Sequence, residues 1–582
     1  MNWTPCNSAC VIRAGTTILI YEQMCATEKR RRRSRGLLPK LARRTLINEA
    51  VCEGCGDCSQ TSNCLSIEPV ETAFGTKRRI NQSSCNQDFT CVKGFCPSFV
   101  IAEGAQPKKP KPLQTETRSA PADNLPQPLL PSSKTPYRIL ITGVGGNGVV
   151  TIGALIGMAA HLEHKGTSVL DMTGLAQKGG AVTSHVQIAD NPAALCASRI
   201  ATAEANLLLG CDSIVSASRE VLSRSLKGLT RGVVNSSETP TAEFILNRDW
   251  HFPGQSIHQD LQATLGDDCH FLDANALAVK LLGNAIYANA LLLGYVWQQG
   301  WLPLQLDSLL QAIRINGVQV ENNQQALHWG RYFAVHDEQI ADMLQPATET
   351  RKATGGTDND TAIAVIERYQ QLLSAYQNPA YAQRYQALLQ PLLEREQGLR
   401  GSDSDLPLTA LAARHLGRLM AYKDEYEVAR LYSEPAFMEQ LRAIFEGEPG
   451  QDYQVHLQLA PPLLARKDAN GHPVKRAYGP WMFKLMPWLA KLKFLRGTAL
   501  DVFGYSAERR QERALIREYA ELVDQVARHL NKGNQQAAQE LLDSVAGIRG
   551  FGHIRQRSQQ GFAAGKEALL KRFLDSGVKA AA

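Results

Sequence analysis

The 582-residue chain has no long hydrophobic run. Its most apolar stretch, residues 276–297, is interrupted by Lys280, Asn284 and Asn289, so it falls short of the roughly 20 apolar residues that a bilayer-spanning helix needs. A second apolar patch, residues 16–21, is too short for the core of a secretory signal. These absences predict a protein without membrane contact and favour a cytoplasmic location.

Aromatic residues are few, at 7% of the chain, and none interrupts the most basic segment, residues 29–35. Because this segment offers no ring on which a base could stack, we expect no nucleic-acid partner and interpret it as a solvated helix end. The net charge of +7 is a mild excess that would favour docking to an acidic protein. With 44% apolar and 20% charged residues, the composition predicts a globular protein of three or four domains.

Cysteine is concentrated rather than scarce: seven of the 13 cysteines lie between residues 52 and 96. The first four follow the spacing Cys52-x2-Cys55-x2-Cys58-x5-Cys64. The remaining three are Cys85, Cys91 and Cys96, and Pro97 follows the last of them. This spacing is typical of bacterial-ferredoxin segments that bind iron–sulfur clusters through thiolates, so it predicts a ferredoxin-like module for electron transfer.

The spacing also predicts which residues share a cluster. In two-cluster ferredoxins, the last cysteine of each run binds the other cluster. The first set is then a [4Fe-4S] site made of Cys52, Cys55, Cys58 and Cys96. The second set has only three cysteines, and Asp88 occupies the missing position in Cys85-x2-Asp88-x2-Cys91, with Cys64 completing the set. Because carboxylate is a harder ligand than thiolate, we expect either an aspartate-ligated four-iron cluster or a three-iron cluster here.

Two other interpretations of these cysteines remain open. Zinc sites use four ligands in paired two-cysteine loops, and a third cysteine at the same spacing exceeds that pattern. Disulfide frameworks belong to small secreted chains, which a 582-residue chain without a signal segment does not resemble. The other cysteines show no ligand spacing and are interpreted as ordinary buried or free thiols: Cys6, Cys10, Cys25, Cys196, Cys211 and Cys269.

Two linkers are predicted to divide the chain. Residues 103–136 contain eight prolines, which is typical of a semi-extended linker, and residues 337–360 form a second linker that is rich in glycine near its end. The predicted domains are residues 1–46, 47–102, 137–336 and 361–582.

The domain at 137–336 opens with a strand, a glycine-rich turn, a helix and a further strand, which predicts a βαβ unit. Further apolar segments at 205–209 and 232–235 extend the pattern to an open, doubly wound α/β sheet. The turn contains Gly143, Gly145, Gly146 and Gly148. With Asp171 about 20 residues on, it matches a dinucleotide fingerprint, which would make the chain a nicotinamide enzyme. Alternatively, the turn serves packing and binds no nucleotide.

A second glycine loop, residues 174–180, follows the next strand. Ligands bind at the carboxyl ends of strands in such sheets. Lys178, Gly179 and Gly180 would therefore meet a phosphate or carboxylate group, unless Lys178 is simply a surface lysine on a turn.

The domain at 361–582 is predicted to be rich in helices, because apolar residues recur at helical spacing at 411–432 and 507–530. Unusual strings interrupt this domain at 422–427, 459–462, 478–481 and 547–553. They contain no catalytic constellation, so we expect them to pack against and cap the other domains; the catalytic residues stay unknown.

Together, several strings resemble the fused bacterial indolepyruvate:ferredoxin oxidoreductase family over most of the chain. They are residues 22–33, 51–58, 93–99, 143–148, 422–430 and 548–553. The resemblance implies that residues 137–336 form a gamma-type domain of 2-oxoacid:ferredoxin oxidoreductases, a domain that does not bind nicotinamide. Its glycine loops are then expected near coenzyme A or at an interdomain face.

That family decarboxylates arylpyruvates on thiamine diphosphate with Mg²⁺, transfers the acyl group to coenzyme A and passes electrons through iron–sulfur clusters to ferredoxin. The chain departs from the pattern because it contains no Gly-Asp-Gly start of a thiamine diphosphate motif. Residues 15–46 resemble only the end of the thiamine domain. The resemblance therefore implies a carboxy-terminal portion that needs a separate thiamine-binding half, forms a homo-oligomer, and does not oxidise 2-oxoacids alone. Alternatively, the chain is an inactive fragment whose domains fold without activity.

Overall fold

The computed structural model describes residues 24–34, 36–39, 41–108, 125–174, 180–239, 241–344, 360–401, 405–461 and 473–579, with Thr16, Ile18, Ile20 and Glu22 before them. The chain divides into two compact units. One contains residues 1–107 and 355–582, and the other contains residues 108–354. Within the described segments, no helix is both long and apolar enough to cross a membrane.

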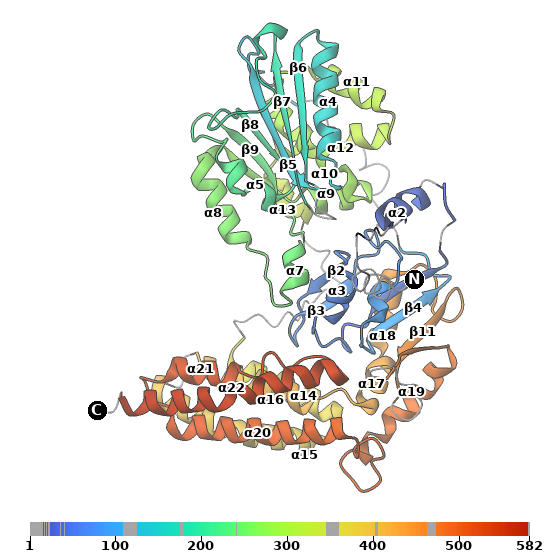
Figure 1. Cartoon of the computed structure of the whole chain (residues 1–582), viewed down its shortest axis with the longest axis vertical. Helices are drawn as coiled ribbons and strands as arrows, with labels where there is room; N and C mark the ends of the chain where they lie inside the picture. The colour runs from blue at the N-terminus through green and yellow to red at the C-terminus, as the bar shows by residue number, and fades with distance from the viewer. Residues whose placement is uncertain are drawn as a thin grey trace. The chain divides into compact units, whose positions relative to one another are not determined.

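The unit of residues 108–354 is built on a six-stranded sheet (Figure 1). The strand order is β10-β9-β8-β5-β7-β6. The strands are β5 (Tyr137–Val144), β6 (Gly166–Thr173), β7 (Ala181–Ala189), β8 (Leu207–Gly210), β9 (Arg231–Asn235) and β10 (Cys269–Leu272). Strand β7 is antiparallel to both of its neighbours, whereas β5, β8, β9 and β10 pair in parallel.

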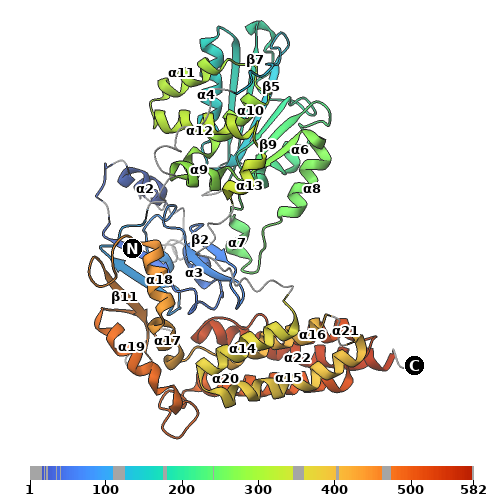
Figure 2. The same ribbon diagram turned by 180° about the vertical axis from the view of Figure 1, so that it is seen from behind.

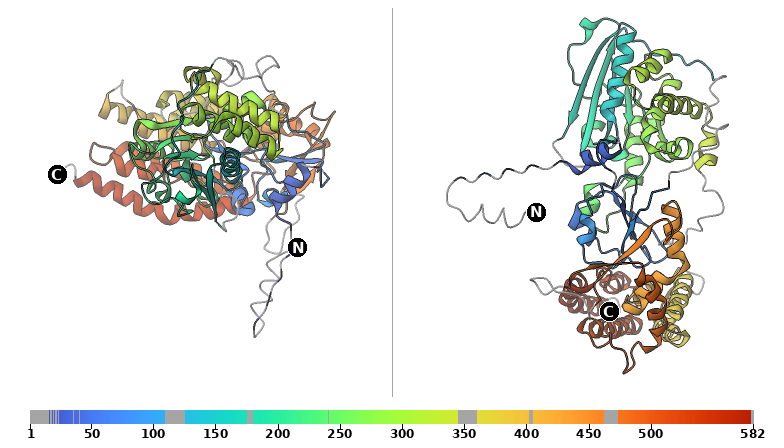
Figure 3. Two further views of the ribbon diagram at one scale, coloured as in Figure 1. Left: turned by 90° about the horizontal axis from the view of Figure 1, so that it is seen from above. Right: turned by 90° about the vertical axis from the view of Figure 1, so that its right-hand side faces the viewer.

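Helices cover both faces of this sheet, because successive side chains of a strand point to opposite sides. Ile139 and Ile141 pack into one apolar core, and Leu140 packs into the other. The first core is closed by α4 (Val149–Leu162), α9 (Ala274–Leu282), α10 (Ala288–Gln298), α11 (Leu306–Asn316) and α12 (Val320–Phe333). The second is closed by α5 (Ser213–Ser216), α6 (Arg219–Leu222) and α8 (Gly254–Leu265) (Figures 1 and 3).

The predicted α/β class is confirmed for this unit, with two differences. The segment after β6 returns as the antiparallel strand β7, which the sequence analysis did not anticipate. The short helix α13 (Glu338–Leu344) lies inside the predicted linker 337–360, because Ile340, Met343 and Leu344 pack against the first core. The short helix α7 (Ala242–Leu246) completes the unit.

In the other unit, a four-stranded antiparallel sheet joins segments that are far apart in the chain. The order is β1 (Arg43–Ile47), β4 (Phe99–Glu103), β11 (Gln454–Leu459) and β12 (Arg476–Tyr478). The predicted segments 47–102 and 361–582 thus share one sheet, although the domain boundaries themselves stay predictions. The cysteine-rich segment adds the hairpin β2 (Ile67–Val70) and β3 (Lys77–Ile80), with α2 (Ala26–Ser34), α3 (Asp57–Ser62) and η1 (Thr90–Lys93).

The predicted helix-rich carboxy-terminal region is confirmed (Figure 2). One group of helices packs around a shared apolar core: α14 (Ala362–Tyr376), α15 (Pro379–Arg400), α16 (Pro407–Met420), α20 (Ala507–His529), α21 (Gln535–Asp543) and α22 (Gly552–Lys579). A second group packs instead with the cysteine-rich segment in a separate core: α17 (Glu425–Ser433), α18 (Pro435–Ile444) and α19 (Trp481–Lys491).

Candidate functional site

The first cysteine run lies in a tight turn after β1. Asn48 Oδ1 accepts hydrogen bonds from the backbone N–H groups of Ala50 and Val51 at 3.0 and 3.4 Å. Gly54 has a φ of +64°, and a Cβ there would lie 2.4 Å from the Thr76 carbonyl oxygen, so no other residue fits without a shift. The Gly54 N–H points at Cys52 Sγ, 3.3 Å away. The turn thus curls its backbone around the first thiol.

The structure brings together the four residues of the first predicted set. Burial raises the pKa of Cys58, and the thiols of Cys52, Cys55 and Cys96 raise it further. Burial followed by the Cys52 thiol raises the pKa of Cys96 to about 11, although Cys96 Sγ lies 2.9 Å from Ser98 Oγ. Four buried or half-buried thiols that repel one another as anions gain from a shared positive centre.

The second predicted set is also brought together. Burial, Cys64, Cys85 and then Asp88 raise the pKa of Cys91 to about 12. Burial and the same neighbours, Cys64 and Asp88, raise the pKa of Cys85. These electrostatic neighbours agree with the two predicted sets, whose role as ligands stays a prediction.

The backbone on each side of Asp88 adopts an uncommon conformation. Gln87 and Phe89 have φ values of +56° and +58°, which non-glycine residues rarely adopt. The Gln87 N–H points at Cys85 Sγ at 3.4 Å, and Asp88 Oδ1 accepts from the Thr90 N–H at 3.0 Å. Such strain is typical of functional turns. Here it holds an exposed carboxylate within the electrostatic reach of two thiols.

Cations that no sequence pattern predicted lie near both sets. Arg78, which is only 1% exposed, interacts electrostatically with Cys52, Cys55 and Cys58 of the first set. Arg30 and Arg44 interact with Cys85 of the second set. Arg30 belongs to the basic segment 29–35, and its guanidinium donates to the Ser83 carbonyl at 3.2 Å, so part of that segment packs against the cysteine loop. Nearby positive charge favours thiolate over thiol.

The donor chemistry fits iron–sulfur clusters. The seven cysteines are free, so no disulfide competes for them. Among the described residues, no group of three or more His, Cys, Asp or Glu side chains is arranged to hold a metal ion. A four-iron cage is larger than one ion and needs its thiolates further apart. Cluster binding by these residues stays a prediction.

The carboxy-terminal segments enclose the first set. Lys423 Nζ lies 2.6 Å from Glu53 Oε1, and an Arg555 guanidinium nitrogen lies 3.7 Å from Glu53 Oε2. Although burial alone would raise it, Lys423, Lys77 and Arg555 lower the pKa of Glu53 to about 2. A Cβ on Gly550 would lie 3.2 Å from Cys55 Cβ. The strings at 422–427 and 547–553 were expected to pack against other parts of the chain. In the structure, residues of both strings lie against the loop that carries Cys52 and Cys55.

In the other unit, the two glycine loops meet. The Gly145 N–H donates to the Gly180 carbonyl at 2.8 Å, so both loops lie at the carboxyl ends of β5 and β6. Gly146 and Gly148 have φ values of +103° and +83°, and Gly148 precedes the first turn of α4. A Cβ on Gly143 would lie 2.7 Å from Val149 Cγ2, so this glycine serves close packing. Lys178 and Gly179 lie outside the described residues.

The strand order differs from that of a dinucleotide fold. Asp171 lies on β6, and β7 separates β6 from β5, which leads into the glycine loop. In the dinucleotide fold, the strand bearing the ribose-binding acid pairs directly with the strand before the glycine loop. The arrangement does not favour Asp171 as a ribose ligand.

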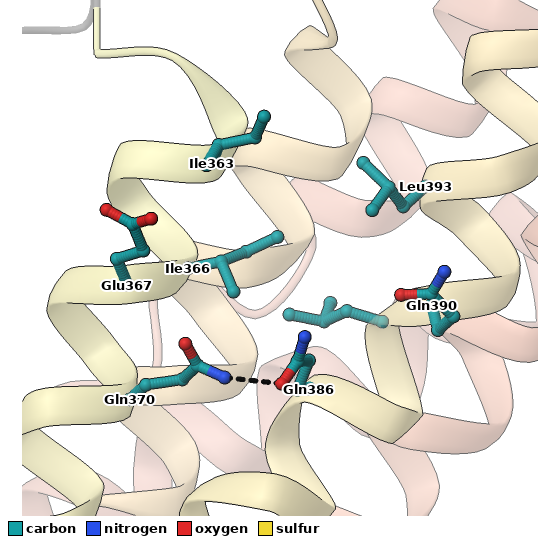
Figure 4. A pocket seen from close by; sticks show the side chains of 8 residues that line it. Ile363, Ile366, Glu367, Gln370, Gln386, Gln390 and Leu393 are labelled. Carbon is teal, nitrogen blue, oxygen red and sulfur yellow. Dashed lines mark hydrogen bonds between the residues drawn. The ribbon is translucent and has the colours of Figure 1, made fainter.

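A shallow surface pocket between α14 and α15 contributes nothing to these sites (Figure 4). Gln370 Nε2 donates to Gln386 Oε1 across it at 2.6 Å, and Glu367 and Gln390 lie at its edge. Its amides and aliphatic side chains form no nucleophilic or metal-binding group.

Two parts of the chain match known families. Residues 138–332 match the family described as pyruvate ferredoxin/flavodoxin oxidoreductase. Residues 362–568 match DUF6537, a family of unknown function.

Curated proteins are similar to part of the chain. Indolepyruvate oxidoreductase subunit IorB of Methanothermobacter thermautotrophicus is 27% identical over 180 residues, which covers 31% of this chain and 87% of that protein. The protein of the same name from Pyrococcus horikoshii is 26% identical over 183 residues, covering 31% of this chain and 86% of its own length.

Solved structures were also found. The pyruvate oxidoreductase subunit PORC of Thermotoga maritima is 18% identical and covers 34% of this chain and 97% of its own, with a TM-score of 0.25. The 2-oxoglutarate:ferredoxin oxidoreductase of Magnetococcus marinus is 12% identical and covers 35% of this chain and 32% of its own, with a TM-score of 0.26.

Through residues 138–332 and the similarity to these curated proteins, part of the chain resembles the 2-oxoacid oxidoreductases. Within that class, the predicted resemblance to the indolepyruvate:ferredoxin oxidoreductases is confirmed.

Proposed function

We propose that this chain is the electron-transfer and acyl-transfer part of an indolepyruvate:ferredoxin oxidoreductase. The complete reaction converts an arylpyruvate and coenzyme A into aryl-acetyl-coenzyme A, CO₂ and a proton. Two oxidised ferredoxins each accept one electron, so the reaction balances. The names of the relatives, which are subunits of indolepyruvate oxidoreductases, support this substrate class.

The observation that carries the proposal is that the seven cysteines are buried or half-buried thiols with electrostatic neighbours in two groups. The first set would hold a [4Fe-4S] cluster, and the second, with Asp88, would hold a four-iron or three-iron cluster. Such clusters accept and release single electrons when bound. The chain's own residues hold the thiols in place, aim backbone N–H groups at Cys52 and Cys85, and keep cations such as Arg78 beside them.

The acyl-transfer role is assigned to the unit of residues 108–354. Gly145 and Gly146 are exposed at the carboxyl ends of the strands, where ligands of open α/β sheets bind. The unpaired N–H groups at the start of α4 follow them and favour an anion such as a phosphate of coenzyme A. Lys178 and Gly179 are proposed to complete this loop.

Thiamine diphosphate and Mg²⁺ are proposed to come from a separate half. The test is to co-express this chain with a candidate thiamine-binding half, without air, and to follow the reduction of ferredoxin with indolepyruvate and coenzyme A. The proposal predicts ferredoxin reduction by the pair and none by either chain alone. Turnover by the isolated chain, or tight binding of NADH to it, would contradict the proposal.

A further inference from the structure

The carboxy-terminal region brings one lysine to the cysteine sets. Lys475 immediately precedes β12, which pairs with β11, which in turn pairs with β4. This chain of pairings places Lys475 beside the segment that leads into β4. Its Nζ donates to the Cys96 carbonyl at 3.1 Å and lies 5.1 Å from the centre of the Phe99 ring.

The electrostatic neighbours of Lys475 come from both sets. They are Cys96 and Cys58 of the first set, Cys91 of the second, and Asp57 within the first cysteine run. By contrast, the cysteine neighbours of Arg78 all belong to the first set, and Cys85 of the second set is the cysteine neighbour of Arg44. Lys475 is therefore placed to act on two centres at once.

Building on the proposed function, we infer that Lys475 raises the reduction potentials of both iron–sulfur centres. Reduction adds one negative charge to a centre, and a nearby cation stabilises the more negative form. The hydrogen bond to the Cys96 carbonyl fixes the ammonium group next to a ligand of the first centre. Lys475 belongs to the carboxy-terminal region, which matches a family of unknown function over residues 362–568. By holding this lysine beside the cysteines, the region would set the reduction potentials of the centres.

The test is a potentiometric titration of the reconstituted full chain, followed by electron paramagnetic resonance. Dithionite, through mediator dyes, supplies one electron to each centre, and no bond forms or breaks. Lys475→Met should make reduction about tenfold less favourable at the first centre, a fall in potential of about 59 mV, with a smaller fall at the second. Lys475→Arg, which keeps the charge, should restore most of the wild-type value.

A matched control is Lys484→Met, which removes an exposed lysine on α19. This control should leave both potentials unchanged. If the Lys475→Met chain does not retain its centres, Lys475→Gln keeps a donor for the Cys96 carbonyl while removing the charge, and it should show the same fall. Unchanged potentials in a charge-removing variant would overturn the inference. A wild-type chain that takes up no cluster would instead overturn the proposed function, so the two failures are distinguishable.

Discussion

Lys423 Nζ lies 2.6 Å from Glu53 Oε1, and this ion pair joins the first cysteine run to the carboxy-terminal region. The lysine and glutamate side chains are 11% and 9% exposed. Lys423 also donates to the carbonyls of Val51 and Cys52 at 3.2 Å. The Lys423 side chain therefore favours the ionised form of Glu53 and also holds the backbone at Val51 and Cys52 in place.

Replacing Lys423 with methionine should destabilise the unit of residues 1–107 and 355–582 strongly. The change leaves Glu53 buried with less compensation, and breaking a buried pair by removing one partner costs about 3–5 kcal/mol. Urea unfolding of the purified chain measures the loss. Lys484→Met, on the exposed side of α19, is the control and should change stability by no more than about 0.5 kcal/mol. Equal stability of the two variants would show that the pair has no structural role.

Stability of the other unit should fall in mild acid because of His185. Its Nδ1 accepts the Ile200 N–H at 3.1 Å, and burial, Arg224 and Arg199 lower the pKa of His185 to about 4. Because the folded pKa is below the ordinary value of 6.5, this contribution is complete above pH 6.5 and is lost as the pH falls toward 4.

The expected loss is about 2 kcal/mol between pH 6.5 and 4, measured by denaturant unfolding at a series of pH values. His185→Asn keeps an acceptor but does not titrate, so its stability should depend less on pH. His251→Asn, at an exposed site in the same unit, should keep the wild-type dependence. If both variants follow the wild-type curve, His185 does not cause the acid sensitivity.

The two ligand sets stay predictions from the cysteine spacing, which is read from short segments of the sequence. The same spacing singled out Asp88, and the structure places it beside Cys85 and Cys91. The enclosing contacts could not be predicted, since the positions of Lys475 and Gly550 depend on pairings between distant segments. A signal was nevertheless present for Gly550, which lies in the unusual string at 547–553.

In the six-stranded sheet of residues 137–272, some strands could likewise be predicted from the sequence and one could not. Strands β5, β6, β8 and β9 were predicted from short apolar runs with glycine turns. Strand β7 was missed although it is almost wholly buried, because its polar members Thr183, Ser184, His185 and Gln187 obscure the apolar pattern. Burial on both faces removes the alternation that identifies a strand with one solvated face.

Replacing Asp88 with cysteine should convert the second centre to a fully thiolate-ligated four-iron cluster. The substitution supplies the missing soft ligand in the Cys85-x2-Asp88-x2-Cys91 pattern. Where the wild type holds a three-iron centre, iron should rise from about seven to about eight atoms per chain, and the resonance of the oxidised three-iron centre should disappear. If the wild type holds four irons there, the resonance of the reduced centre should change. Asp88→Ala supplies no ligand, so it should not raise the iron content, and it should lower the iron content if the wild type holds four irons there. A cluster signal that is the same in the wild type and the cysteine variant would remove Asp88 from the site.

Gly145→Ala should weaken binding of coenzyme A without unfolding the chain. The residue is exposed, its φ lies outside the left-handed region, and an added Cβ would lie 3.4 Å from the Gly180 carbonyl oxygen, so the backbone tolerates it. The methyl group would occupy the space of the proposed ligand and should lower affinity about tenfold, which is about 1.4 kcal/mol by calorimetry.

Gly228→Ala is a poor control because its φ is +83°, whereas Ala193→Gly alters an exposed site without that strain. Equal affinity in the Gly145→Ala and Ala193→Gly chains would place coenzyme A elsewhere.

The most direct test is to reconstitute the purified full-length chain without air with ferrous salt and sulfide, and to measure bound iron and its spectrum. Two centres predict about seven or eight iron atoms per chain, a brown colour and a resonance signal on reduction. A control with Cys58 and Cys91 both replaced by serine should lose most of the iron. A wild-type chain that emerges colourless and iron-free from this treatment would contradict the central claim.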